Sequence, residues 1–380
     1  MKWMHLILAM LPMLILYGCK IDPPLHLRRL VEAEVAVDMN FEVDMMWQID
    51  WHTEWNFDWK TEVWGPLEYD DPASIRMHTY TLGADGERRA HTVNNFAGME
   101  GTVSVFVGTH DLLFHNNDSE VLLFRADEDL SPIHAYTRVI SSGLKGSIPV
   151  QTTSQKEQAK TKDSVTDMEN EPVTFQPDEL FRLFDPAHYV SDNLADYDYI
   201  DGRYVLRIEG ELTPGTFIYL IQVRLLNNLG RVTGSVGGGA LTGVADGVNL
   251  ETGVTHDNRV SVPFDVYLNQ EADPDLLGAR VMTFGIPACN PYDSLSVKAA
   301  PQTPHYLVLN VTFATGHYKN VRVDITDLFR DLPTGGVITL ELDVNDFPPE
   351  EIDPPVDEGG GFNPVIGEWN EQVGTTTIIN

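Results

Sequence analysis

The chain has 380 residues, a length that fits two domains of roughly 100 to 200 residues each. Its 57 acidic and 25 basic residues leave a formal net charge of −32, so its surface should repel phosphate backbones and anionic membrane surfaces. Nucleic acid is therefore excluded as a partner. With only two cysteines, the chain has neither a disulfide framework nor a four-cysteine zinc site.

Residues 1–18 have the pattern of a signal peptide, with one early charge, Lys2, and an apolar run that is too short to span a membrane. The run ends in Leu16-Tyr17-Gly18-Cys19, which resembles the lipobox of bacterial lipoproteins. We therefore expect lipidation at Cys19, a mature chain that begins there, and anchoring in the outer membrane, with the protein at the cell surface.

From Val31 to Trp59, apolar residues occupy the odd positions and polar or acidic residues most of the even ones. This period of two predicts extended strand with one buried face. The tryptophans of this region share the phase of the buried face, which favours a core role over an exposed platform for glycans. The residues concerned are Trp47, Trp51, Trp55 and Trp59, and Trp64 follows just beyond the alternating run.

Further strand-like runs follow on both sides of a polar segment, and Asp85-Gly86 predicts a hairpin turn. The runs before the segment are 75–82, 102–109, 120–125 and 133–139. The runs after it are 204–208, 217–226, 260–268, 279–284, 306–314, 321–325 and 337–344. Short helices are expected at 177–184 and 326–330. The chain is therefore predicted to be all-β, with two β-sandwich domains in tandem and short helices.

The predicted domain organisation follows from where the composition changes. It comprises a signal peptide (1–18), an N-terminal β-sandwich (19–150), a polar linker (151–176), a C-terminal β-sandwich (177–346), and a Pro/Gly-rich leash that ends in a strand (347–380). That last strand either folds back on its own domain or pairs with the edge of another chain. Its candidate strand-exchange residues are Val365, Trp369, Val373, Ile378 and Ile379.

No segment has the spacing of a catalytic or metal site. Asp196, Asp198 and Asp201 depart from the calcium-loop pattern and are read as a solvated acidic turn. The glycine-rich run 234–239 lacks the order of a nucleophile elbow and is read as a flexible loop. The histidines are scattered, so each is read as a lone surface or core residue, and Cys289 as a small buried residue. We expect no enzyme activity, no catalytic residues, no metal and no cofactor.

Three stretches of the sequence carry a resemblance: the run Cys19-Lys-Ile-Asp-Pro-Pro-Leu-His-Leu-Arg-Arg, the acidic and Trp-rich stretch that follows it, and the run Gly239-Ala-Leu-Thr-Gly-Val-Ala-Asp-Gly-Val-Asn-Leu. With these stretches the chain resembles a family of Bacteroidales lipoproteins that is similar to the fimbrillin-like proteins. The resemblance implies transthyretin-like, fimbrillin-type sandwiches and a role as a fimbrial subunit. In that group, stalk subunits polymerise after an arginine-specific protease removes the N-terminal peptide, and Arg28 and Arg29 stand at a position where such a cut is possible.

A cut after Arg29 would release only residues 19–29, a short peptide with two consecutive prolines that is a poor core strand. The sequence therefore favours an accessory fimbrial subunit of the anchor or tip type, held in the outer membrane by its lipid and acting in assembly or adhesion through β-strand contacts. Its partners would be other fimbrial subunits or a surface ligand. The alternative is a surface lipoprotein that binds a glycan or host ligand and is not part of a pilus.

Overall fold

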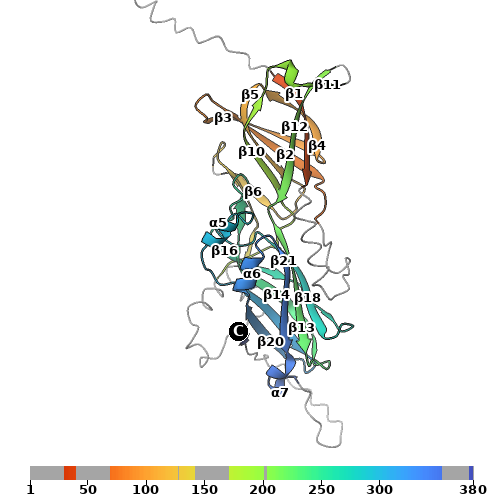
Figure 1. The fold of residues 1–380 in the computed structure, drawn as a ribbon. Coiled ribbons are helices and arrows are strands. Elements are labelled where there is room, and N and C mark those ends of the chain that lie inside the picture. Colours follow the sequence, from red (N-terminus) through yellow and green to blue (C-terminus); the bar gives the residue numbers. More distant parts are fainter. Residues whose placement is uncertain are drawn as a thin grey trace, which may run out of the picture.

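The computed structural model describes residues 30–39, 69–126, 128–141, 171–200, 203–352 and 376–379. Two β units lie end to end in an elongated molecule (Figure 1). Strands dominate and the helices are short. The predicted all-β class with tandem β-sandwiches and short helices is therefore confirmed.

The first unit is built from one eight-stranded sheet that folds over its own core. Its strands are β1 (Leu30–Met39), β2 (Ser74–Leu82), β3 (Arg88–Ala97), β4 (Glu100–Phe106), β5 (Gly108–Asn116), β10 (Phe181–Val190), β11 (Asp198–Ile200) and β12 (Arg203–Pro214). The order is β3-β2-β5-β10-β12-β1-β4, with β11 paired to β12. Met77 lies opposite Phe114 near one end of the sheet and Ala33 lies opposite Val103 at the other, and all four share one core. The two ends of the sheet therefore face each other as a sandwich.

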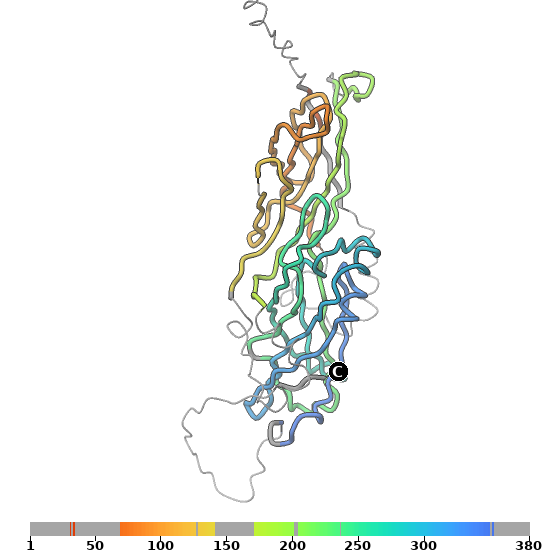
Figure 2. Tube along the Cα trace, turned by 90° about the vertical axis from the view of Figure 1, so that its left-hand side faces the viewer, coloured from red at the N-terminus to blue at the C-terminus, as the bar shows by residue number. Residues whose placement is uncertain are grey.

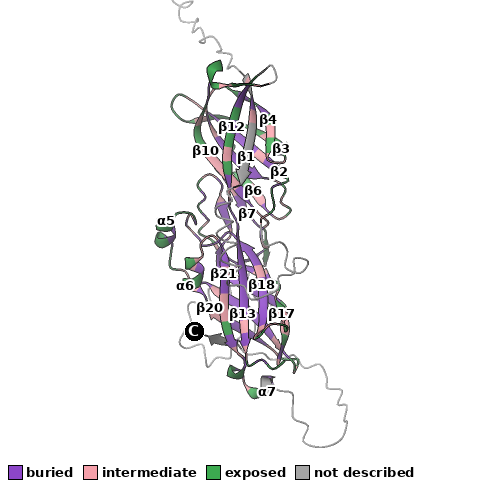
Figure 3. Cartoon of the chain, turned by 45° about the vertical axis from the view of Figure 1, so that its right-hand side comes forward, coloured by how far each residue is buried: buried purple, intermediate pink, exposed green. Residues whose placement is uncertain are grey.

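The second unit is a sandwich of two sheets. One has the order β17-β18-β13-β21 and the other β22-β20-β19-β14-β16-β9-β8. The strands of the first are β17 (Tyr267–Asn269), β18 (Asp275–Thr283), β13 (Phe217–Leu226) and β21 (Gly336–Asp343). Those of the second are β22 (Thr376–Ile379), β20 (Tyr318–Asp324), β19 (Tyr306–Phe313), β14 (Val232–Ala245), β16 (Arg259–Phe264), β9 (Val173–Thr174) and β8 (Val139–Ser141). Tyr219 and Val281 of one sheet pack in one core with Val311 and Val321 of the other. Figure 3 shows how fully β13 and β18 are buried.

The two units share strands at their junction. A three-stranded sheet joins β6 (Leu123–Ala126) and β7 (Ile133–Tyr136) to β15 (Gly247–Asn249). Leu113 and Leu122 from before the predicted linker pack in one cluster with Val248 and Phe284 from after it. β10 and β12 also follow residues 151–176, yet they pair with β5 and β1. Figure 2 shows the chain around β12 running along the first unit toward the second, where β13 begins.

Several predicted elements are confirmed. The run 217–226 is β13, 75–82 lies in β2, and Asp85-Gly86 turns the hairpin between β2 and β3, with Gly86 at φ 82°. The predicted helix near residue 326 is α6 (Thr326–Asp331). The other short helices are η2 (Leu194–Asp196), α5 (Ser294–Ala299), η3 (Val344–Asp346) and α7 (Pro349–Ile352). In the described part of the chain, no helix is long and apolar enough to cross a membrane.

Two local predictions are wrong. Residues 177–184 do not form a helix, because β10 begins at Phe181, whose N–H donates to Asn116 Oδ1 at 2.8 Å. The run 234–239 is not a flexible loop but part of β14. Its glycines provide a bulge, since the register with β19 shifts between Ser235 and Gly239. Gly238 has φ +71°, and a Cβ there would lie 2.1 Å from the carbonyl oxygen of Phe264.

Candidate functional site

The C-terminal strand lies at an edge of the second unit. β22 pairs in parallel with β20, in a register that places Thr376 opposite Asn320 and Ile379 opposite Val323. Because β22 ends the order of the seven-stranded sheet, it occupies an edge to which an extended segment can add by backbone hydrogen bonds alone. Ile378 and Ile379 thus belong to this strand, whereas Val365, Trp369 and Val373 lie outside the described residues.

β20, the strand next to β22 in the sheet, carries buried polar groups on the face opposite the core. Asn310 and Asn320 face each other across β19 and β20, and the Nδ2 of Asn320 donates to the Oδ1 of Asn310 at 2.7 Å. Arg322, opposite Ile378 in the register, is also buried. A buried amide pair opposes register slips, because a shift by one residue would break the hydrogen bond between the two buried amides. β20 is therefore fixed where β22 adds to it.

At the other end of the molecule, β1 lies between two strands. It pairs in parallel with β12 and antiparallel with β4, and Ala33 is fully buried. Cys19, Arg28 and Arg29 lie outside the described residues, and Arg29 directly precedes Leu30, where β1 begins. The sequence has no arginine between Arg29 and Arg76, and Arg76 is inside β2. An arginine-specific cut ahead of the folded unit therefore leaves β1 in place.

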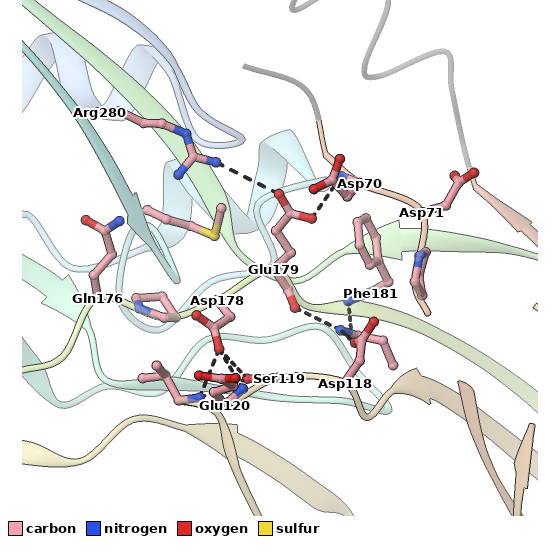
Figure 4. Close-up of a pocket in the computed structure, with 15 residues that line it drawn as sticks. Asp70, Asp71, Asp118, Ser119, Glu120, Gln176, Asp178, Glu179, Phe181 and Arg280 are labelled. Atoms are coloured by element: carbon pink, nitrogen blue, oxygen red, sulfur yellow. Dashed lines mark hydrogen bonds and ion pairs between the residues drawn. The ribbon is translucent and has the colours of Figure 1, made fainter. Parts of the chain in front are cut away.

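A cavity of about 440 Å³ lies where the two units meet (Figure 4). Asp178 closes one side, because its Oδ2 accepts from Ser119 Oγ and from the N–H groups of Glu120 and Val121 at 2.8–2.9 Å. Glu179 lines another side, accepts from the Asp70 N–H at 2.9 Å and faces Arg280 at 3.9 Å. Burial raises the pKa of the Glu179 carboxyl to about 7. These carboxylates hold loops and strands from both units together.

Five histidines form two hydrogen-bonded chains, so the prediction of lone histidines is wrong for them. His78 lies between His91 and His115, with ring nitrogens at 2.9 and 3.1 Å. The Nδ1 of His115 faces the carbonyl oxygen of Asn116 at 2.6 Å, so it must donate, and neutral tautomers then follow in order along the chain. Burial lowers the pKa of His78 to about 3 and that of His115 to about 4.

The second histidine chain crosses the junction. The Nδ1 of His134, in β7, lies 2.9 Å from the Nε2 of His256, whose Nδ1 lies 2.8 Å from Asp246 Oδ1. Sequence spacing gave no signal for the contact of His78 with His115 or of His134 with His256, because these residues lie 37 and 122 positions apart. The same holds for Glu179 and Arg280.

The residues that the sequence analysis weighed as catalytic or metal-binding candidates are Cys289, Asp196, Asp198 and Asp201. Cys289 is buried as predicted, and burial raises the pKa of its thiol to about 11, which opposes thiolate formation. Asp196 lies in η2 and Asp198 in β11, whereas Asp201 lies outside the described residues. Among the residues that the structure describes, no three His, Cys, Asp or Glu side chains are grouped to hold a metal ion. The tryptophans of residues 47–64 also lie outside the described ranges.

Comparisons with known proteins identify the family. The sequence matches the DUF5119 family, described as a domain of unknown function, over residues 54–265, which is more than half of the chain. The chain belongs to this family. No curated protein was found to match the sequence.

Several solved structures are similar to the chain at low sequence identity. One, described as a candidate adhesin from Bacteroides ovatus, is 16% identical, with 86% of this chain and 94% of that chain covered and a TM-score of 0.47. A second, from Bacteroides thetaiotaomicron, is described as a candidate polysaccharide-binding protein (8% identity, 82% and 91% covered, TM-score 0.43). A third is the fimbrial anchor protein Mfa2 of Porphyromonas gingivalis (11% identity, 82% and 90% covered, TM-score 0.40).

Proposed function

We propose that the chain is an accessory fimbrial subunit of the anchor or tip type, held in the outer membrane by a lipid on Cys19, that acts in assembly or adhesion through β-strand contacts. The observation that carries the proposal is the edge position of β22, which among the described strands pairs with β20 alone. A strand held by four paired residues at a sheet edge can exchange between its own chain and a neighbour at little cost, because the same backbone bonds form in both states.

The position of β1 supports an accessory subunit over a polymerising stalk subunit. A stalk subunit needs a vacated strand position to accept a neighbour's strand. Here β1 fills the position between β12 and β4, and it follows Arg29 in the sequence. Cleavage at Arg28 or Arg29 therefore leaves every described strand of the first unit in place. Strand contacts of the chain with its neighbours would therefore form at the edge of β20 and β22, not at a position opened by proteolysis.

The test is removal of the exchangeable strand. Deleting residues 376–380 should abolish association with the fimbrial fraction of the cells, while the midpoint of thermal unfolding stays near that of the intact chain. The matched control is Thr377→Val with Ile379→Val, which keeps a β-prone strand of the same length and should retain association. Unchanged association of the deleted chain would contradict the proposed strand contact. A midpoint far below that of the intact chain would show that β22 is needed for folding.

The anchor is tested separately by intact mass and N-terminal analysis of the protein from its native membrane. An acylated Cys19 at the N-terminus supports the anchored subunit. A chain that begins at Leu30 without lipid would refute it and favour proteolytic maturation.

A further inference from the structure

The end of the first unit at which β1 begins carries a group of exposed aromatic and apolar side chains. Leu30 is paired with Phe106 at the end of β4, and Val190 at the end of β10 is paired with Gly108. Tyr204 lies two residues before Leu206, which is paired with Ala33 of β1. Register therefore brings the start of β1, the end of β10 and the β11–β12 hairpin to one end of the molecule, where Figure 1 shows β1 and β11.

We name this surface the tyrosine end and define it by its exposed members. Their exposed fractions run from 39% to 67%, and they are Phe106, Tyr189, Leu194, Tyr199 and Tyr204. Tyr199 and Tyr204 lie opposite each other on the hairpin, with ring centroids 5.1 Å apart. Exposed aromatic rings gathered at one place are typical of a contact surface.

This end carries more acidic than basic residues, and its basic residues in β12 are Arg203 and Arg207. Asp192, Asp196 and Asp198 are exposed around the tyrosines. Arg207 offsets little of that charge, because it is shared between Asp198 at 3.0 Å and Glu209 at 3.7 Å. Tyrosine faces beside carboxylates suit an arginine side chain, whose planar cation stacks on aromatic rings while its N–H groups donate to carboxylates. The same combination occurs inside this chain, where the Arg88 guanidinium lies 4.0 Å from the Tyr80 ring centroid and pairs with Asp111.

A basic segment of the chain itself ends at this surface. Residues 26–29 read His-Leu-Arg-Arg, and Arg29 is joined directly to Leu30. At about 3.3–3.6 Å per residue, the Cα of Arg28 lies no more than about 7 Å from that of Leu30. In a chain with 57 acidic and 25 basic residues, Arg28 and Arg29 are thus a pair of cations close in sequence to the end of the molecule where Asp192, Asp196 and Asp198 are exposed.

From this juxtaposition we propose that the tyrosine end is the docking surface for the basic segment 26–29, and that the contact shields Arg28 and Arg29 from arginine-directed proteases. The contact forms within one chain, so it does not depend on a role in fimbriae. It gives a physical reason for the segment that precedes β1 to stay attached to it.

Hydroxyl-radical footprinting of the full chain in detergent tests the contact, after intact mass has shown that residues 26–29 are present. Tyr199 and Tyr204 should be oxidised at least about twofold more slowly in the wild type than in Arg28→Gln/Arg29→Gln, and about 0.5 M NaCl should remove the difference by screening. Tyr267, exposed in the second unit, is the internal reference. Arg138→Gln/Lys298→Gln, which removes the same charge from exposed positions elsewhere, should leave the footprint as in the wild type.

Proteolysis gives the second readout. Asp192→Asn/Asp198→Asn should raise the rate of trypsin cleavage after Arg28 or Arg29 severalfold at low salt, whereas the control Asp257→Asn/Asp265→Asn should not. Equal oxidation of the tyrosines with and without the arginines, or equal cleavage rates in both aspartate variants, would overturn the proposal. Protection that grows with protein concentration would overturn it too, because the occupant would then be a second copy of the chain.

Discussion

Arg88 makes the densest set of polar contacts across the junction, so its replacement is the most direct test of how the two units are joined. Its guanidinium donates to both carboxylate oxygens of Glu251 at 2.8 and 2.9 Å, to Asp111 at 3.0 Å and to the carbonyl oxygen of Leu130 at 3.1 Å. Arg88 belongs to the first unit and Glu251 follows β15 of the second. The side chains are only 9–15% exposed.

Arg88→Met keeps much of the side-chain volume and removes the charge. Breaking a buried ion pair costs about 3–5 kcal/mol, and partial exposure lowers our expectation to about 2–4 kcal/mol, because two carboxylates are left without their cation. The loss of stability should appear as a fall of several degrees in the thermal midpoint, at roughly 2–4 °C per kcal/mol for a domain of this size.

Arg89 provides the control. It is the next residue and also pairs with an aspartate, Asp85, but both side chains are more than half exposed. Arg89→Met should cost less than about 1 kcal/mol. Urea unfolding of the two variants, together with Glu251→Gln and the double variant, gives the coupling energy between Arg88 and Glu251. A cost for Arg88→Met no greater than that for Arg89→Met, or no coupling, would refute the view that this contact holds the units together.

Two further predictions concern pH and the bulge of β14. His78 and His115 have pKa values of about 3 and about 4 in the folded chain and near 6.5 in the unfolded chain, so the unfolded state binds more protons between these values. The free energy of unfolding should therefore fall as the pH drops from about 6.5 to 5, by up to about 2 kcal/mol per histidine. Urea midpoints should be measured against pH in a Glu179→Gln background, because the raised pKa of Glu179 makes stability depend on pH with the opposite sign. In that background, His115→Phe should make the dependence of stability on pH weaker. An unchanged dependence would contradict the assignment to the histidines. Gly238→Ala should lower the free energy of unfolding by about 2–4 kcal/mol, because φ is positive there and the new Cβ would overlap the Phe264 carbonyl. The control Gly230→Ala, at φ +78° in open space, should lower it by only about 1–2 kcal/mol. Equal losses would show that the overlap at Gly238 is relieved.

The sequence predicted the strands well where local pattern alone determines them. β13 has the predicted bounds, because Phe217–Leu226 is apolar apart from Gln222 and Arg224, as a strand buried on both faces requires. It failed at β10, where the Asn116 side chain and the ladder with β5 extend the chain at residues whose apolar spacing also fits a short helix. It failed at residues 234–239 because glycines that permit a bulge and glycines that permit a loop have the same composition.

The candidate sites show the same division. The edge strand of Ile378 and Ile379 was accessible from local β propensity, and its partner β20 was not. The contacts of His78 with His115, of His134 with His256 and of Glu179 with Arg280 form only when distant segments of the chain meet, so no spacing in the sequence could have indicated them.

The junction also decides how a load would pass through the molecule. Only Gly215 and Thr216 separate β12 from β13, and the Tyr69 hydroxyl donates to the carbonyl oxygen of Thr216 at 2.9 Å. Domains joined by small polar interfaces usually move against each other, but here a shared β ladder and a shared apolar cluster connect the units. A pull between the start of β1 and the end of β22 would have to break that ladder and cluster before the units could separate. The four-residue pairing of β22 with β20 lies at the end of its sheet and involves one neighbouring strand, so we expect strands to part first at this edge, where strand exchange requires it.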